Sequence, residues 1–161
     1  MSDNHRCHKI SGKVEQVNKS QYKNNITINI YNNIKEKYGY ISSFAIWHNQ
    51  INQKNRSGME DILFFENIND DLLKKLNTNF VIVGLNISKK IPRCFGNFHS
   101  NYKYSNDYKI RYALENTIFW GSYMTDIIKD FEEKISGEIV KYLNAGSVAQ
   151  WLLYFYKIIK V

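Results

Sequence analysis

Proline and cysteine are scarce in this sequence of 161 residues, which has one Pro and two Cys, Cys7 and Cys94. Two cysteines are too few for the disulfide framework of a small secreted domain. No segment reaches the about 20 apolar residues of a membrane-spanning helix. The polar residues 1–20 have no apolar core of the kind found in a secretory signal. We therefore expect a cytoplasmic protein that does not enter a membrane.

The composition is that of a folded globular chain, with 43% hydrophobic and 23% charged residues. The length suits one domain. We expect a polar leader over residues 1–25 and a single domain over residues 26–161. Because the chain contains twenty asparagines, any one Asn carries little weight by itself.

The formal net charge is +7, and the basic side chains are concentrated in one stretch. Residues 89–111 contain a single acid, Asp107, and five aromatic rings. The six basic residues of this stretch are Lys89, Lys90, Arg93, Lys103, Lys109 and Arg111. Basic groups neutralise phosphates and aromatic rings stack on exposed bases, so this stretch is a candidate for nucleic-acid contact. The alternative is a solvated loop whose rings pack into the core.

In the first half of the chain, residues 26–31 (ITINIY) alternate as a strand does, and residues 62–65 (ILFF) have the pattern of a short buried strand. Residues 69–76 predict a helix capped by Asn69. Residues 80–83 (FVIV) are apolar on both faces, which predicts an interior strand of a parallel sheet.

In the second half, a helix is expected from near Asn106 through Leu114, and a short one over residues 136–143. Between them, residues 118–124 form an apolar segment that leads to Thr125 and Asp126. The apolar tail, residues 148–161, is compatible with a helix or with a helix and a strand. This order of helices and strands predicts an α/β sandwich.

The end of the predicted strand at residues 80–83 is the most informative position for function. Ligands of open α/β sheets bind beyond the carboxyl ends of strands. Gly84 allows close approach of a ligand, and Asn86 can position a water molecule or read a base edge. The alternative is that Asn86 is a turn residue in an Asn-rich chain.

Residues 95–99 (FGNFH) combine two rings, a flexible point, an amide and an imidazole. A ring and an amide together can hold a heterocycle, with stacking on one face and hydrogen bonds on one edge. His99 can bind phosphate or assist an anionic leaving group. The alternative is a loop whose side chains anchor it to the core, and for His99 alone this alternative is favoured.

Metal and cofactor sites are not expected. His5, Cys7 and His8 crowd one short segment without a second ligand cluster, and no glycine-rich phosphate loop occurs. Asp126 and Asp130 lie four residues apart, which is typical of a solvated acidic helix face. Of the two, Asp126 is the better functional candidate because it directly follows the apolar segment; a helix N-cap is the alternative.

Four motifs, taken together in order and spacing, resemble a bacterial and phage branch of the uracil-DNA glycosylase superfamily. They are residues 83–88 (VGLNIS), 95–99 (FGNFH), 107–113 (DYKIRYA) and 121–126 (GSYMTD), and the resemblance covers roughly residues 38–143. It implies a three-layer α/β sandwich around a mainly parallel sheet. It also implies extrusion of a base from DNA and hydrolysis of its N-glycosidic bond by a positioned water, without cofactor or metal.

By this resemblance Asn86 is the catalytic residue that holds the water, and Phe98 stacks on the flipped base. Gly84, Asn97 and His99 complete the base pocket. Two departures stand beside it. Ile87 and Ser88 occupy a place where the family often has Pro-Gly, and no histidine follows His99 to match the family's later histidine motif. The fold is therefore expected to be incomplete at the C-terminus.

Two functions follow from these expectations. The first is a DNA-repair hydrolase that binds single-stranded DNA or a flipped base. The alternative is a non-catalytic binding module on the same fold, such as a phage or mobile-element inhibitor of a host nucleic-acid enzyme, with a protein partner or a second copy of the chain covering its apolar surface.

Overall fold

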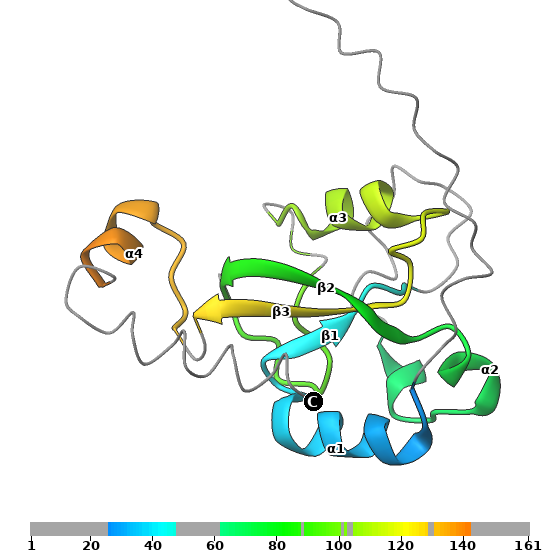
Figure 1. The fold of residues 1–161 in the computed structure, drawn as a ribbon. Coiled ribbons are helices and arrows are strands. Elements are labelled where there is room, and N and C mark those ends of the chain that lie inside the picture. The colour runs from blue at the N-terminus through cyan, green and yellow to red at the C-terminus, as the bar shows by residue number, and fades with distance from the viewer. Residues whose placement is uncertain are drawn as a thin grey trace, which may run out of the picture.

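The computed structural model describes residues 26–47, 62–87, 89–100, 102, 105–128 and 131–142. Over these residues the protein is a small mixed α/β fold with a three-stranded sheet and four α-helices (Figure 1). The elements in chain order are α1 (Ile28–Tyr38), β1 (Ser42–Phe44), the 3-10 helix η2 (Leu63–Phe65), α2 (Asp70–Leu73), β2 (Asn77–Asn86), α3 (Asp107–Leu114), β3 (Ser122–Ile128) and α4 (Ser136–Tyr142). The predicted leader at residues 1–25, the tail at residues 148–161, Lys103 and Asp130 lie outside the described residues.

The sheet has the strand order β1-β3-β2, with β3 in the middle. β2 runs parallel to β3, and β1 runs antiparallel to it. The strand predicted at residues 80–83 is confirmed within β2, but its interior position is not, because among the described strands β2 pairs with β3 alone. With one parallel and one antiparallel pair, a three-layer sandwich around a mainly parallel sheet is not confirmed.

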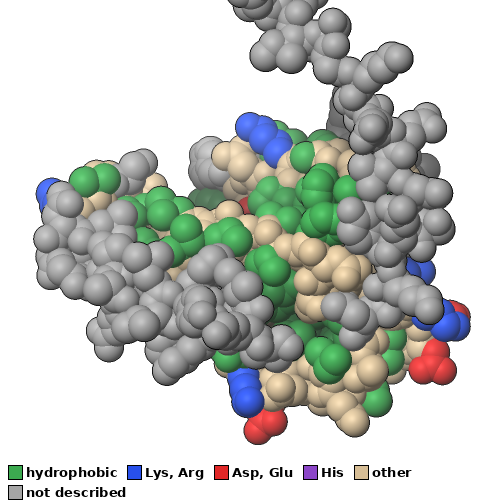
Figure 2. Space-filling model, in the orientation of Figure 1, with side chains coloured by type: hydrophobic (Ala, Val, Ile, Leu, Met, Phe, Trp, Pro, Cys, Tyr) green, Lys and Arg blue, Asp and Glu red, His purple; other side chains and the backbone are tan. Residues whose placement is uncertain are grey.

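Apolar side chains pack on both faces of this sheet because successive strand residues point to opposite sides. On the first face, which we call the α1 face, Phe44 and Tyr123 pack in one cluster with Tyr31 of α1. On the opposite face, the α3 face, Met124 packs in a second cluster with Leu114 of α3. Figure 1 shows α1 and α3 on opposite sides of the strands. In the view of Figure 2, hydrophobic side chains gather over the region of the strands and charged ones lie toward the margins.

The strand predicted at residues 26–31 is wrong, because this segment enters helix α1. Thr27 caps the helix by accepting a hydrogen bond from the Ile30 amide at 3.3 Å. Tyr31 and Ile34 are the buried side chains of α1 and lie three residues apart, so they share one helix face. Of the alternating isoleucines, Ile28 and Ile30 are exposed, so the alternation does not mark a buried strand face.

The strand predicted at residues 62–65 is also wrong, since Leu63–Phe65 form one turn of 3-10 helix. The Phe65 amide donates to the Ile62 carbonyl at 2.9 Å. By contrast, the helix capped by Asn69 is confirmed, although α2 ends at Leu73. The Asn69 side chain accepts from the Leu72 amide at 2.9 Å.

The helices predicted near Asn106 and over residues 136–143 are confirmed as α3 and α4. The apolar segment that precedes Asp126 leads into β3, and Asp126 itself lies within the strand rather than at a helix cap. A helix with the length and apolar character needed to cross a bilayer does not occur in the described part of the chain.

Gly121 is the last residue of the turn before β3 and supplies a first test of the fold. Its φ is +82°, and a Cβ there would lie 1.7 Å from the Lys75 carbonyl oxygen. A left-handed backbone alone costs an L-residue about 1–2 kcal/mol, so we expect Gly121→Ala to lower the free energy of unfolding by more than this. Chemical denaturation measures it. Gly137→Ala is the matched control, because a Cβ there meets nothing within 4 Å, and equal losses in the two variants would contradict the prediction.

Candidate functional site

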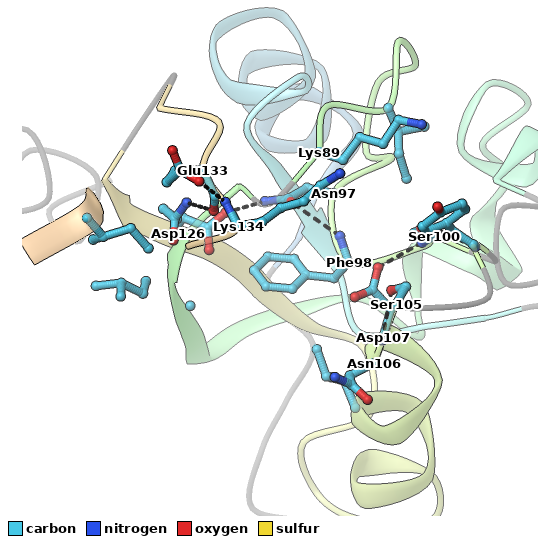
Figure 3. Close-up of a pocket in the computed structure, with 17 residues that line it drawn as sticks. Lys89, Asn97, Phe98, Ser100, Ser105, Asn106, Asp107, Asp126, Glu133 and Lys134 are labelled. Atoms are coloured by element: carbon cyan, nitrogen blue, oxygen red, sulfur yellow. Dashed lines mark hydrogen bonds between the residues drawn. The ribbon is translucent and has the colours of Figure 1, made fainter. Parts of the chain in front are cut away.

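A cavity of about 600 Å³ opens at the carboxyl ends of the two parallel strands, β2 and β3, on the α3 face of the sheet. Gly84 and Asn86 of β2 and Asp126 of β3 line it, together with Asn97 and Phe98. Figure 3 shows Asn97 and Asp126 beside each other, with the ring of Phe98 next to them. Crevices at this end of an α/β sheet are the usual place for ligands, and the volume lies in the range of small-molecule pockets.

The Asn86 side chain lies at this cavity but uses its amide nitrogen within the protein. Its Nδ2 lies 2.8 Å from the Glu133 carbonyl oxygen, 3.3 Å from that of Phe131 and 3.1 Å from that of Ile87. These three acceptors fix which end of the amide is nitrogen. Asn86 thus ties the end of β2 to the segment before α4, and its Oδ1 is the atom that can take a further partner.

The loop that carries Asn97 and Phe98 is anchored at Phe95. The Phe95 side chain is fully buried, with ring centroids 5.5 Å from Tyr31 and 5.3 Å from Phe44. The Ser43 hydroxyl donates to the Phe95 carbonyl at 2.7 Å. Phe95 and Phe98 both have positive φ, 59° and 66°, a conformation that bulky residues rarely adopt and that is often found at functional sites.

Asp126 is a buried carboxylate, with 1% of its surface exposed. The Asn97 Nδ2 donates to its Oδ2 at 2.7 Å, and the Asn97 Oδ1 accepts from the Phe98 amide at 3.1 Å. Gly84 is the register partner of Asp126. A Cβ at Gly84 would lie 2.2 Å from the Asp126 Oδ1 and 3.0 Å from the Phe98 ring. Because Gly84 has no side chain, the Asp126 carboxylate and the Phe98 ring can both occupy this space.

A second carboxylate, Asp107, lies at the first turn of α3 and also lines the cavity. Its Oδ2 accepts from the Ser100 amide at 2.8 Å, and its own amide donates to the Ser105 hydroxyl at 3.2 Å. Burial raises the pKa of Asp107, and the hydrogen bond from Ser100 opposes that shift. In Figure 3, Ser100, Ser105 and Asp107 lie together on one side of Phe98 and Asp126 on the other.

The predicted basic residues differ in their exposure to solvent. Lys89 is exposed at the cavity, with its ammonium 5.5 Å from the centroid of the Tyr102 ring. Lys90, Arg93 and Lys109 are exposed as well. Arg111 is 2% exposed, and its Nη2 lies 3.4 Å from the Glu115 carboxylate. The Arg111 guanidinium therefore lies in the interior, away from any surface that tracks a phosphate backbone.

His99 does not lie at the cavity. It is fully buried, its Nε2 lies 3.3 Å from the Phe44 carbonyl oxygen, and its ring packs 5.0 Å from Trp47 and 5.9 Å from Phe65. The predicted pocket role of His99 differs from this placement. The structure instead has the alternative arrangement, in which the buried His99 side chain anchors the loop to the core.

Sequence reasoning found Gly84, Asn86, Asn97 and Phe98 as site residues but gave Asp107 no role and left Asp126 as a candidate without a place. For Asp126 the available signal was its position directly after an apolar segment. The signal for Asp107 was weaker, since a lone acid within a basic stretch resembles an ordinary helix start. Among the described residues, no group of three or more His, Cys, Asp or Glu side chains is arranged to hold a metal ion.

Comparison of the chain with protein-family models, with curated proteins and with solved structures gives no match.

The raised pKa of Asp107 predicts a pH-dependent stability. Because its folded-state pKa lies above its unfolded-state value, the contribution is fully present below the unfolded-state pKa, about 3.9, and is lost as the pH rises through the folded-state pKa. We expect Asp107→Asn, which removes this titration, to gain stability relative to the parent protein as the pH rises through that window. Urea unfolding over the same range measures it.

Asp71→Asn is the control for this measurement, because the Asp71 side chain is 86% exposed. A stability difference between Asp107→Asn and the parent protein that stays constant with pH would contradict the prediction.

Proposed function

We propose that this protein binds DNA and receives an unstacked nucleobase in the cavity at the ends of β2 and β3, as a DNA glycosylase does. The observation that carries the proposal is one cavity that combines an aromatic ring, Phe98, with a buried carboxylate, Asp126, that an amide holds. A ring offers a stacking surface to any base, and polar groups at its edge add recognition. The finer architecture, a three-layer sandwich, belongs to this proposal, and the apolar clusters on both faces of the sheet support it.

DNA would be held at the mouth of the cavity by exposed cations. Lys89 and Lys134 line the opening and are exposed. Lysines at such a rim attract phosphates and release counterions, which makes binding weaken as salt is added. Beneath them, the floor formed by Gly84, Asn97 and Phe98 is where the extruded base would lie.

Hydrolysis at this site would use Asp126 as the general base, with the oxygen of Asn86 as a second acceptor for the water. The water oxygen forms a bond to C1′ of the deoxyribose, the C1′–N bond breaks, and its electron pair leaves with the base. The proton lost by the water goes to the Asp126 carboxylate. Asn97 keeps that carboxylate in place through its 2.7 Å hydrogen bond.

A second candidate function is base binding without hydrolysis. It is favoured by the geometry of Asn86, whose amide nitrogen faces three backbone carbonyls and so has no hydrogen left to donate to substrate. The low exposure of Asp126 favours it too, since a general base has to reach the water that it activates. The pocket would then serve recognition alone.

Stacking on Phe98 predicts the effect of removing the ring. Base–aromatic stacking contributes about 1–3 kcal/mol per base, so Phe98→Ala should weaken binding of single-stranded DNA by roughly the corresponding 5- to 150-fold. Fluorescence anisotropy at several salt concentrations measures it, and the salt dependence of the parent protein and the variant should be the same because no cation is removed.

Phe119→Ala is the matched control, because Phe119 is 39% exposed and packs on Phe80, outside the cavity. Equal affinities of the parent protein and Phe98→Ala would contradict a stacking role for this ring.

Asp126→Asn tests the hydrolytic part of the proposal. This nearly isosteric change removes the group that accepts the proton, and general-base catalysis contributes about 10²–10⁴-fold to a rate, so base release from modified or mismatched DNA should fall by that order. Chromatography of the free base measures release, and Asp71→Asn is the control on an exposed aspartate. Release that is unchanged in Asp126→Asn would exclude this residue as the base. Absence of release by the parent protein from a broad panel of substrates would leave the second candidate function.

A further inference from the structure

We infer that the cavity selects bases whose edge donates hydrogen bonds, of the guanine type with an amino group beside a ring N–H, over uracil, and that Asp107 receives this edge. The inference rests on the proposed nucleobase pocket and deepens it by naming the class of base. It follows from which hydrogen-bonding atoms at the cavity already have partners within the protein.

Three asparagines line the cavity, and two of them, Asn86 and Asn97, do not supply the usual mixture of donor and acceptor; the third, Asn106, is exposed. All hydrogens of the Asn86 amide face backbone carbonyls, so a further partner of that side chain has to be a donor. The Asn97 amide is fixed at both ends, with its nitrogen on Asp126 and its oxygen on the Phe98 amide. An amide fixed in this way cannot rotate to suit a carbonyl of the ligand.

Carboxylates add to this excess of acceptors. Asp107, Asp126 and Glu133 all line the cavity, and an ionised carboxylate is an acceptor only. The cations Lys89 and Lys134 lie among the exposed residues of the opening, as phosphate contacts require. The hydroxyls of Ser100 and Ser105 and the amide of the exposed Asn106 also line the cavity and can donate. The three carboxylates and the Asn86 oxygen nevertheless give the interior more acceptors than donors, and the lysines at the mouth attract anions.

Asp107 is the carboxylate best placed to receive a base edge. It is half-buried, so it remains within reach of a ligand, whereas Asp126 is 1% exposed. One of its oxygens, Oδ2, is oriented by the Ser100 amide at 2.8 Å. Figure 3 shows its carboxylate beside Phe98, the ring on which a base would stack. The raised pKa of Asp107 agrees with a charge that burial leaves poorly solvated.

The two kinds of base edge meet these acceptors differently. Guanine presents N1–H and the N2 amino group next to each other, and one carboxylate can accept from both. Uracil presents a single N–H between two carbonyl oxygens. These two oxygens would lie opposite acceptors of the protein, with no donor between them. A polar site built for one pattern rejects the other because its buried groups are left unpaired.

The experiment measures binding of guanosine, inosine and uridine to the full chain by ligand-observed NMR titration. Inosine lacks only the 2-amino group of guanosine, so this pair isolates that donor without any change to the protein. A bidentate base contact discriminates by about 1–3 kcal/mol, or roughly 5- to 150-fold. We expect guanosine to bind more tightly than uridine by a factor in this range and inosine to bind more weakly than guanosine.

Asp107→Asn replaces one acceptor with a donor and should reduce the ratio of guanosine to uridine affinity, whereas Asp71→Asn on exposed α2 should not change it. Uridine binding as tightly as guanosine would overturn the inference and leave the nucleobase pocket standing. An unchanged ratio in a folded Asp107→Asn variant would overturn the assignment to Asp107. No binding of any of the three nucleosides at millimolar concentration would instead contradict the proposed pocket itself.

Discussion

The site depends on one constraint, the burial of the two aromatic side chains at the ends of a five-residue loop. Phe95 lies in the α1-face cluster, and His99 lies between the rings of Trp47 and Phe65. Because both ends are fixed in the core, Asn97 and Phe98 between them have little freedom to move. The positive φ of Phe98 is a cost that only such anchoring sustains. Packing in both apolar clusters thus holds the polar and stacking groups of the loop in place.

The parallel pairing of β2 and β3 supplies the second half of the site. It places Asp126 opposite Gly84, and the missing side chain leaves room for the carboxylate and for the ring of Phe98. Burial of an ionised carboxylate is costly unless hydrogen bonds compensate it, and Asn97 donates one at 2.7 Å. The loop and the strands therefore depend on each other: Asn97 of the loop donates to the buried Asp126 side chain, and Asp126 of β3 orients the Asn97 amide.

Much of the local structure was predictable because its signals lie close together in sequence. Asn69 caps α2 within three residues, and the apolar residues 80–83 are part of β2. The failures share a cause, which is that the deciding contact is distant. Residues 26–31 alternate, but the Tyr31 ring is buried by packing on Phe44 and Phe95, and its hydroxyl donates to the Phe65 carbonyl, 34 residues away. A short pattern does not reveal such a partner.

The same distinction applies to the site. The glycine and asparagine at the end of β2 were predictable, since a ligand position follows from the strand alone. His99 was harder, because an imidazole in a polar motif has the same sequence signal whether it faces a cavity or the Phe44 carbonyl. The position of Asp126 at the site depends on the pairing of β3 with β2, in the register that places Asp126 opposite Gly84. No local pattern contains that register.

The orientation of Asn86 changes what the site can do chemically. An asparagine at a strand end can present its amide nitrogen or its oxygen, and these options favour opposite partners. Here the carbonyls of Phe131 and Glu133, in the segment after β3, accept hydrogen bonds from the Asn86 amide nitrogen. The hydrogen-bonding character of the cavity is therefore determined partly by a segment that was not expected to belong to it. Because that segment also carries Lys134 at the opening, one piece of chain contributes both to the acceptor-rich floor and to the cationic mouth.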